Sequence, residues 1–219
     1  MIKPRPGGRT AKKRRDILAA AQEAFLESGY EGASMDSIAA AANVSKPTIY
    51  KHFNDKDKLF AAAIVAEIAA AESKTAALIQ ALPTSKNLEH DLGQFARAHV
   101  ADVMQPQLVR MRRRLIGEAE RFPELASTWY QNGPARGHQT LADIFSKLAE
   151  RGLLQMDDPA LAAEHFNWLI LSIPLNRAMF YASEIIDTAS YDYYADAAVR
   201  VFLAAYGRAG AAPGVRSRS

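Results

Sequence analysis

The chain contains no cysteine, which excludes disulfide bonds, thiolate metal sites and thiol redox chemistry. Long apolar runs are also missing, because the two most apolar stretches, residues 59–71 and 168–175, are too short to cross a bilayer. The N-terminus MIKPRPGGRTAKKRR has no apolar core, so we expect no secretory signal. These absences favour a protein that works in the cytoplasm and makes no contact with a membrane.

Signatures of catalysis are missing as well. The five histidines form no HExxH motif and no pair at i, i+4 spacing. The chain also has no glycine-rich phosphate loop and no nucleophile elbow. We therefore expect that the protein is not an enzyme, and that it holds neither a metal nor a cofactor.

Basic charge is concentrated at the N-terminus. The first 60 residues hold 11 Lys and Arg against 7 Asp and Glu, whereas residues 61–207 hold 13 against 17. A positive N-terminal part that precedes a negative central part indicates a polyanionic partner for the positive part. A solvated, unstructured arm would explain the same charge if no folded motif followed it.

The predicted fold is all-α. Apolar residues make up 49% of the chain, and no stretch shows sustained alternation of period two, so helix is the expected state nearly throughout. Capping residues, prolines and glycines place the helices at about residues 10–28, 35–42, 46–53, 56–82, 87–104, 106–121, 123–133, 134–151, 158–183 and 191–206. The helix that ends at Leu82 would be roughly 40 Å long, and Pro174 would kink the helix that contains it.

These helices suggest a small N-terminal domain and a larger C-terminal one. We predict a disordered basic arm at residues 1–8 and a three-helix helix-turn-helix DNA-binding domain at residues 9–55. A larger helical domain would occupy residues 56–207, and a disordered tail residues 208–219.

Residues 34–60, SMDSIAAAANVSKPTIYKHFNDKDKLF, carry the strongest functional signal. Two short helical patterns flank a brief turn, the arrangement in which a second helix enters the DNA major groove. In that second helix Val44, Ile49 and Phe53 would face inward and leave lysines, a proline and hydroxyl groups outside. Such groups suit a duplex, because lysines and hydroxyls pair with phosphates or base edges and a proline ring can contact a thymine methyl. The alternative is an ordinary solvated helix face.

The segment closely resembles the N-terminal signature of the TetR family of bacterial transcriptional regulators. The matching residues are Ile17, Ala20, Ala21, Phe25, Gly29, Tyr30, Ser34, Ile38, Ala39, Asn43, Val44, Ser45, Thr48, Ile49, Tyr50, Phe53, Lys56, Asp57 and Leu59. The resemblance implies that Lys46, Pro47 and Lys51 face base edges and that hydroxyl-bearing and basic neighbours hold phosphates. The DNA-contact set, which includes the cap residue Ser45, is then Ser34, Ser45, Lys46, Pro47, Thr48, Tyr50, Lys51, His52 and Lys58.

The stretch RRRLIGEAERFPELASTWYQNGPAR, residues 112–136, resembles the C-terminal domain of the AefR-like subgroup of that family. The resemblance implies that residues 56–207 are an effector-binding and dimerisation domain, which takes a small apolar or amphipathic effector and forms a homodimer through the last two helices. The predicted effector-contact set is Met111, Leu115, Glu118, Phe122, Trp129, Phe145 and Trp168. Large apolar side chains can equally fill a core, and Glu118 can equally pair with Arg114 or Arg121 at the surface.

The sequence thus predicts a sequence-specific DNA-binding transcriptional regulator that acts as a repressor. The partner would be a palindromic double-stranded operator, and a bound effector would release the protein from it. Two alternatives stay open. One is a helical small-molecule carrier whose basic end is incidental, and the other is an architectural DNA binder without sequence preference.

Overall fold

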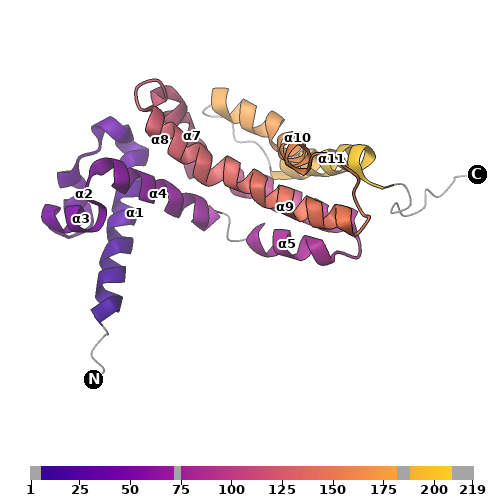
Figure 1. Cartoon of the computed structure of the whole chain (residues 1–219). Coiled ribbons are helices and arrows are strands. Elements are labelled where there is room, and N and C mark those ends of the chain that lie inside the picture. Colours follow the sequence, from indigo (N-terminus) through magenta and orange to yellow (C-terminus); the bar gives the residue numbers. More distant parts are fainter. Residues whose placement is uncertain (1–5, 72–74, 182–187, 209–219) are drawn as a thin grey trace, which may run out of the picture. The chain divides into compact units, whose positions relative to one another are not determined.

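The computed structural model describes residues 6–71, 75–181 and 188–208, and these residues are almost entirely helical (Figure 1). From the N-terminus the elements are α1 (Pro6–Gly32), α2 (Met35–Ala41), α3 (Lys46–Phe53), α4 (Lys56–Ala71), α5 (Thr75–Ala81), the 3₁₀ turn η1 (Leu82–Thr84), α6 (Leu88–Val103), α7 (Pro106–Glu118), α8 (Pro123–Tyr130), the π-helix η2 (Gln131–Ala135), α9 (Arg136–Glu150), α10 (Pro159–Phe180) and α11 (Thr188–Tyr206). Within these ranges the only β-type pairing is an isolated bridge between Leu154 and Gly207. The all-α prediction is confirmed.

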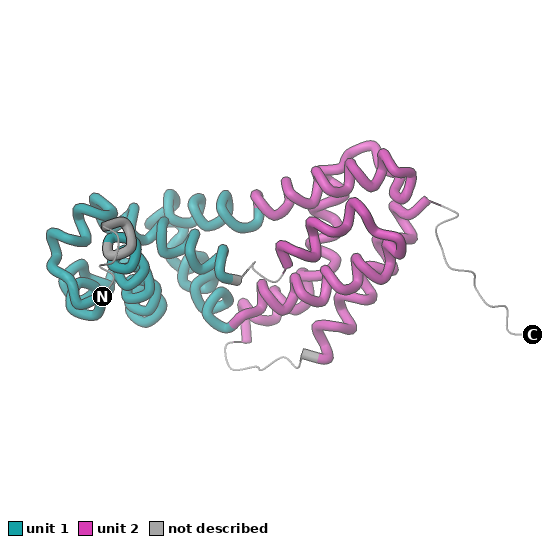
Figure 2. Tube along the Cα trace, turned by 90° about the horizontal axis from the view of Figure 1, so that it is seen from below, with its two compact units in different colours: residues 1–71, 106–134 teal, residues 72–105, 135–219 magenta. Residues whose placement is uncertain are grey.

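The chain forms two compact units, and each is assembled from two separate stretches of sequence (Figure 2). Unit 1 comprises residues 1–71 and 106–134, and unit 2 comprises residues 72–105 and 135–219. α7 and α8 therefore pack with α1 to α4, although a long stretch of chain separates them in sequence. The predicted boundary after residue 55 separates a DNA-binding domain from an effector-binding domain. The two units are defined by packing alone, so this functional boundary stays a prediction.

Unit 1 has one continuous apolar core. Ile17 of α1, Ile38 of α2, Ile49 of α3 and Leu59 of α4 are fully buried in it. α7 and α8 contribute to the same core the buried side chains of Leu108, Met111, Leu115, Leu125 and Trp129. Each large apolar side chain buried in this way contributes about 1.5–3 kcal/mol. The three N-terminal helices and the pair α7–α8 thus share a core whose packing resists independent movement.

An aromatic group joins α1, α4 and the start of α8 within unit 1. The ring of Phe60 lies edge-on to Phe25 and to Tyr30, with centroid distances of 4.7 and 5.2 Å. Tyr30 also meets Phe122, the residue before α8, at 4.9 Å. Edge-to-face pairs of this kind add roughly 0.5–1.5 kcal/mol beyond the area they bury.

α1 begins at Pro6 and ends at Gly32, which is longer at both ends than the predicted 10–28. Gly29, expected to stop the helix, interrupts it instead with φ +71° and ψ 179°. A Cβ atom at this position would lie 2.9 Å from Oε1 of Glu118, so both the backbone and the space favour glycine. Residues 1–5 of the predicted arm and 209–219 of the predicted tail lie outside the described residues.

Three other helix predictions differ from the structure or extend beyond it. The predicted continuous helix 56–82 crosses residues 72–74, and the predicted helix 158–183 ends in residues 182 and 183; both segments lie outside the described residues. The predicted break between Gly133 and Pro134 is wrong, because residues 131–135 continue as a π-helix. A wider turn accommodates a proline that has no N–H to donate.

Unit 2 is built around phenylalanine rings from four helices. Phe166 of α10 meets Phe202 of α11 at 4.8 Å and Phe145 of α9 at 5.5 Å. Phe95 of α6 stacks on Phe166 at 6.3 Å. The start of α10 is fixed by Asp158, which accepts hydrogen bonds from two backbone N–H groups of its first turn. Among the described helices, none is both long enough and apolar enough to cross a membrane.

Candidate nucleic-acid interface

α2 is a short helix with a well-formed start. The Ser34 hydroxyl accepts from the Ser37 N–H at 3.0 Å, and the Ser37 hydroxyl accepts from the Ser34 N–H at 3.2 Å. This reciprocal cap satisfies two backbone donors that a helix start otherwise leaves free. Met35 and Ile38 are buried, which fixes which face of α2 points outward.

The turn between α2 and α3 is set by Asn43, which has a positive φ of 51°. The N–H of Val44 donates to the Ala39 carbonyl at 3.0 Å, so the turn closes on the end of α2. Asparagine is one of the few residues that adopt this backbone region readily. The turn therefore directs the chain from α2 straight into α3, as in a helix-turn-helix.

α3 presents one apolar face and one polar face. Ile49 and Phe53 are buried and Val44 packs beside the core, as the sequence predicted. Pro47 lies in the first turn, where its missing N–H costs little. Ser45 stands at the cap position, but its hydroxyl lies 2.8 Å from the Thr48 hydroxyl and makes no bond to the backbone. Asn54, with φ +62°, caps the helix after its last residue, Phe53.

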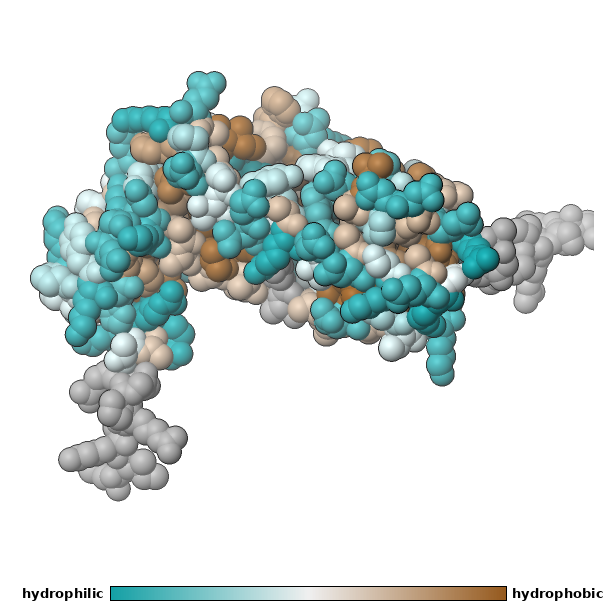
Figure 3. Space-filling model, viewed as in Figure 1, coloured by the Kyte–Doolittle hydropathy of each residue, from teal (hydrophilic) through white to brown (hydrophobic). Residues whose placement is uncertain are grey.

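The structure brings the predicted DNA-contact set together on α2, α3 and the start of α4. Seven of its members are exposed, namely Ser34, Ser45, Lys46, Pro47, Tyr50, Lys51 and Lys58. Thr48 and His52 are half-buried. In Figure 3 the visible surface of α1 to α3 is largely hydrophilic. The arrangement offers cations and hydroxyl groups to a polyanion; the individual contacts with DNA stay a prediction.

Two lysines of this set are paired with acids of the same unit. Lys46 Nζ lies 2.8 Å from Asp36 Oδ2, and Lys58 Nζ lies 3.1 Å from Asp55 Oδ2. The hydrogen bond from Lys46 to Asp36 raises the pKa of the lysine, and the Lys58 backbone N–H lowers the pKa of Asp55. These pairs are exposed, so a phosphate can replace the carboxylate at small cost.

Four exposed basic residues of α1 were not among the predicted DNA contacts. Lys12, Lys13, Arg14 and Arg15 are all exposed on the helix, and the Arg14 guanidinium lies 5.2 Å from the centre of the Phe53 ring at the end of α3. This contact places the positive charge of Arg14 beside α3, the helix predicted to contact DNA. The signal was present in the sequence as the run KKRR.

Polar contacts attach the end of α1 to the rest of unit 1. The Tyr30 hydroxyl donates to Asp57 of α4, and burial together with this bond raises the pKa of Tyr30. The Lys56 ammonium lies 4.5 Å from the centre of the Tyr30 ring. After α7, Arg121 donates through both terminal nitrogens to the carboxylate of Glu31. α1 is thus bound both to α4 and to the segment between α7 and α8.

The predicted effector-contact set is divided between the two units. Five members, Met111, Leu115, Glu118, Phe122 and Trp129, belong to unit 1, where all but Glu118 pack in or against its core. Phe145 is fully buried in unit 2, whereas Trp168 on α10 of the same unit keeps 46% of its surface exposed. Glu118 is half-buried and lies against Gly29 of α1. A role in effector binding stays a prediction for each of them.

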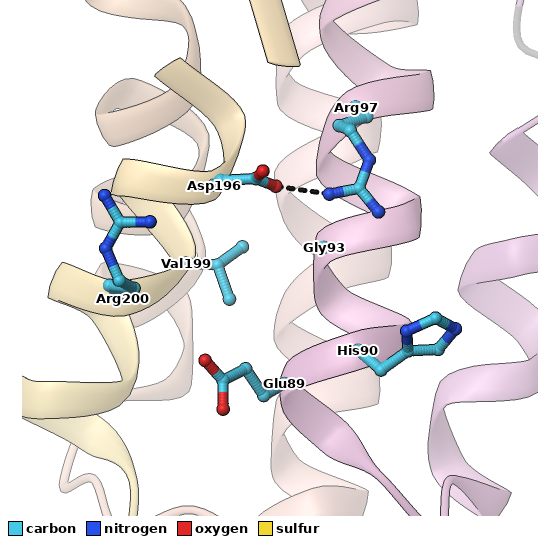
Figure 4. A pocket seen from close by; sticks show the side chains of 7 residues that line it. All are labelled: Glu89, His90, Gly93, Arg97, Asp196, Val199 and Arg200. Carbon is cyan, nitrogen blue, oxygen red and sulfur yellow. Dashed lines mark hydrogen bonds and ion pairs between the residues drawn. The ribbon is translucent and has the colours of Figure 1, made fainter. Parts of the chain in front are cut away.

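A polar recess lies between α6 and α11 of unit 2 (Figure 4). It is lined by Glu89, His90, Gly93, Arg97, Asp196, Val199 and Arg200. Arg97 donates to Asp196 across it. Sites for small organic molecules are mainly apolar with few polar groups, so this mostly charged recess is a poor match for the expected effector.

Comparison with known proteins gives two family matches along the chain. Residues 17–63 match the model for bacterial regulatory proteins of the tetR family, and residues 90–208 match the C-terminal domain of AefR-like transcriptional repressors. Among relatives, the HTH-type transcriptional repressor AcnR from Corynebacterium efficiens is 27% identical over 70% of this chain and 74% of its own length.

Two solved structures are similar over nearly the whole chain. One is a TetR-family transcriptional regulator from Mesorhizobium loti, with 40% identity, a TM-score of 0.84, and coverage of 91% of this chain and 98% of its own. The other is the flavonoid-responsive regulator FrrA, with 31% identity, a TM-score of 0.72, and coverage of 91% of this chain and all of its own.

Proposed function

The chain belongs to the TetR family of bacterial regulatory proteins, and from this premise we propose that it represses transcription as an effector-controlled homodimer. It is a DNA-binding transcriptional regulator of the helix-turn-helix class. The observation that carries the proposal is the two-sided character of α3, whose apolar side is buried in unit 1 while Lys46, Tyr50 and Lys51 remain exposed.

In the proposed complex α3 lies in the major groove. Lys46, Pro47 and Lys51 approach base edges and select the sequence, because lysine donates to guanine acceptors and a proline ring contacts a thymine methyl. Tyr50 and Lys58 hold the phosphates on either side and fix the orientation of the helix without reading sequence. Ser34, Ser45, Thr48 and His52 complete the phosphate contacts.

The proposed dimer forms through α10 and α11. TetR-family regulators act as dimers, and α10 of this chain exposes an unusual amount of apolar surface: Leu161, Trp168, Leu169, Ile173 and Phe180 are each between 37% and 78% exposed. On α11, Tyr193 and Val201 are also exposed. Exposed apolar patches of this kind mark protein interfaces, and a two-fold interface would give a near-palindromic operator.

The proposed effector is a small apolar or amphipathic molecule that binds in the C-terminal part of the chain. The name of the similar regulator FrrA, which is flavonoid-responsive, supports an aromatic molecule. α7 and α8 share their core with the DNA-binding helices and are joined in sequence at both ends to unit 2. They offer a route by which a ligand that prefers the non-binding state lowers DNA affinity.

Selection from a pool of random duplexes, followed by sequencing, tests the proposal. The purified full-length chain should enrich a near-palindromic site, in keeping with a repressor that works on DNA in the cytoplasm. A carrier protein would enrich no duplex, and an architectural binder would bind with steep salt dependence but without a preferred sequence. Either result would contradict the proposed function.

A further inference from the structure

Three of the buried polar side chains of unit 2 lie on three different helices. Asp102 of α6, Asn167 of α10 and His138 of α9 are only 6%, 7% and 9% exposed. His99, one turn before Asp102 on α6, is partly buried beside them, and its Nε2 lies 3.0 Å from Asn167 Oδ1. Asp102 lies one turn after His99 on α6, and His138 also acts electrostatically on the His99 ring, so we treat these four side chains as one polar cluster.

Two atoms of this cluster have no partner. In the described structure neither Oδ2 of Asp102 nor Nε2 of His138 makes a hydrogen bond. The large majority of buried side-chain polar atoms in proteins are paired, and an unpaired one is destabilising by as much as its lost hydration. Two such atoms in one cluster therefore point to a partner that binds from outside the chain.

Aromatic rings lie beside the His99 end of the cluster. Phe95 stacks on the His99 ring at 5.5 Å and on Phe166 at 6.3 Å, and Phe166 in turn meets Phe145. Burial lowers the pKa of both His99 and His138, so both rings are neutral near pH 7. A few convergent polar groups within apolar and aromatic walls are the usual form of a small-molecule site.

We propose that Asp102 Oδ2 and His138 Nε2 form the polar end of the effector site, and that the effector is an aromatic molecule with an O–H or N–H group. This inference rests on the proposed function and specifies its ligand. The carboxylate of Asp102 accepts the ligand's proton donor, and the neutral His138 ring pairs with a second polar atom. The same carboxylate repels carboxylate and phosphate groups, so anionic ligands are disfavoured.

Matched compounds test the ligand class. Naphthalene, biphenyl and flavone, each in a hydroxyl, a methyl ether and a carboxylate form, are titrated into the full-length protein by calorimetry. We expect a hydroxyl form to bind roughly 10- to 100-fold more tightly than its methyl ether, which cannot donate, and the carboxylate to bind most weakly. Equal affinities within every series, or no binding of any hydroxyl form, would overturn the proposal.

Two variants test the residues. Asp102→Asn replaces an unpaired acceptor by a donor, and His138→Phe removes the unpaired nitrogen; both should abolish the preference for the hydroxyl form. Asp143→Asn, the same change at an exposed position of α9, is the matched control and should keep it. A preference that survives Asp102→Asn would overturn the proposal.

Stability without ligand gives a readout that does not depend on the compounds. Because Oδ2 has no partner, Asp102→Asn should leave the melting temperature of the free protein within about 3 °C of wild type. A larger fall would assign Asp102 a structural role and overturn the proposal.

Operator binding separates this inference from the proposed function. If compounds release wild type and Asp102→Asn from DNA equally, the proposed function stands, but the effector site lies elsewhere and this inference is overturned. If compounds bind through Asp102 but never release the protein from DNA, the ligand site stands, but the proposed control by an effector is contradicted.

Discussion

The ammonium group of Lys46, the first residue of α3, lies 2.8 Å from the carboxylate of Asp36 in the first turn of α2. The two helices of the DNA-binding motif are thus joined by an ion pair at the surface that is proposed to face DNA. Asp36 places a negative charge beside that surface and occupies a lysine that DNA would otherwise engage.

Asp36→Asn should therefore increase DNA affinity several-fold, because it frees Lys46 and removes a like charge from the phosphates. Fluorescence anisotropy with the selected operator measures the dissociation constant. Glu124→Gln, which removes one negative charge from α8 of the same unit, is the control. Tighter binding that is equal in both variants would show only an effect of net charge.

Lys58→Ala should weaken binding to all duplexes and reduce the slope of log Kd against log salt by about 1, because one phosphate contact is lost. Lys46→Ala should instead alter which operator bases are preferred. Titrations at several salt concentrations, with Lys86→Ala of unit 2 as control, measure the slope. An unchanged slope for Lys58→Ala would remove this residue from the phosphate contacts.

Gly29→Ala should destabilise the protein by about 1–2 kcal/mol, since the residue has a positive φ and its new Cβ would lie 2.9 Å from Glu118 Oε1. Gly117→Ala is the matched control, because its Cβ meets nothing within 4 Å and the substitution favours helix. Urea unfolding measures both. Equal effects would mean that the α1 interruption carries no strain.

Arg121→Ala should change the free energy of unfolding by less than about 1 kcal/mol, because both partners of its ion pair with Glu31 are well exposed. If this ion pair helps to transmit effector binding from α7–α8 to α1, the effector concentration that releases the variant from DNA should differ from that of wild type. Arg110→Ala, at an exposed position of α7, is the control. An unchanged release curve would exclude the pair from coupling.

Stability should fall as the pH drops below neutral, because burial lowers the pKa of His99 and of His138. Their folded pKa values lie below the ordinary value near 6.5, so the stabilisation is full above that pH and is lost as the pH falls through the folded values. Each histidine contributes a slope of up to about 1.4 kcal/mol per pH unit. Asn167, Asp102 and His138 act on His99, and Glu164 acts on His138.

Urea unfolding between pH 7.5 and 5 measures this dependence. His138→Phe should flatten the profile, and His90→Gln, at an exposed position on α6, should leave it unchanged. A profile that stays the same in His138→Phe would show that this ring does not contribute.

The DNA-binding helices could be predicted because their signals are local. The cap at Ser34, the proline in the first turn of α3 and the inward spacing of Ile49 and Phe53 each depend on residues a few positions apart. The ion pair between Lys46 and Asp36 could not be predicted, because the turn that brings them together depends on the positive φ of Asn43.

Long-range packing could not be predicted from the sequence for a similar reason. Met111, Leu115 and Trp129 were expected to contact an effector or to fill a core, but helical spacing does not say which other helix covers an apolar face. In the structure they join the core of α1 and α4. The unpaired atoms of Asp102 and His138 were equally hidden, because a missing hydrogen bond has no sequence pattern.

The most direct measurement of the central assignment is the affinity of Tyr50→Ala for the operator that the wild-type protein selects. Tyr50 is exposed at 42%, so the substitution leaves the core of unit 1 intact, and circular dichroism checks this. We expect the variant to bind all duplexes at least about ten-fold more weakly than wild type, because a phosphate contact and its packing are lost. Wild-type affinity in a folded Tyr50→Ala protein would contradict the placement of α3 on DNA.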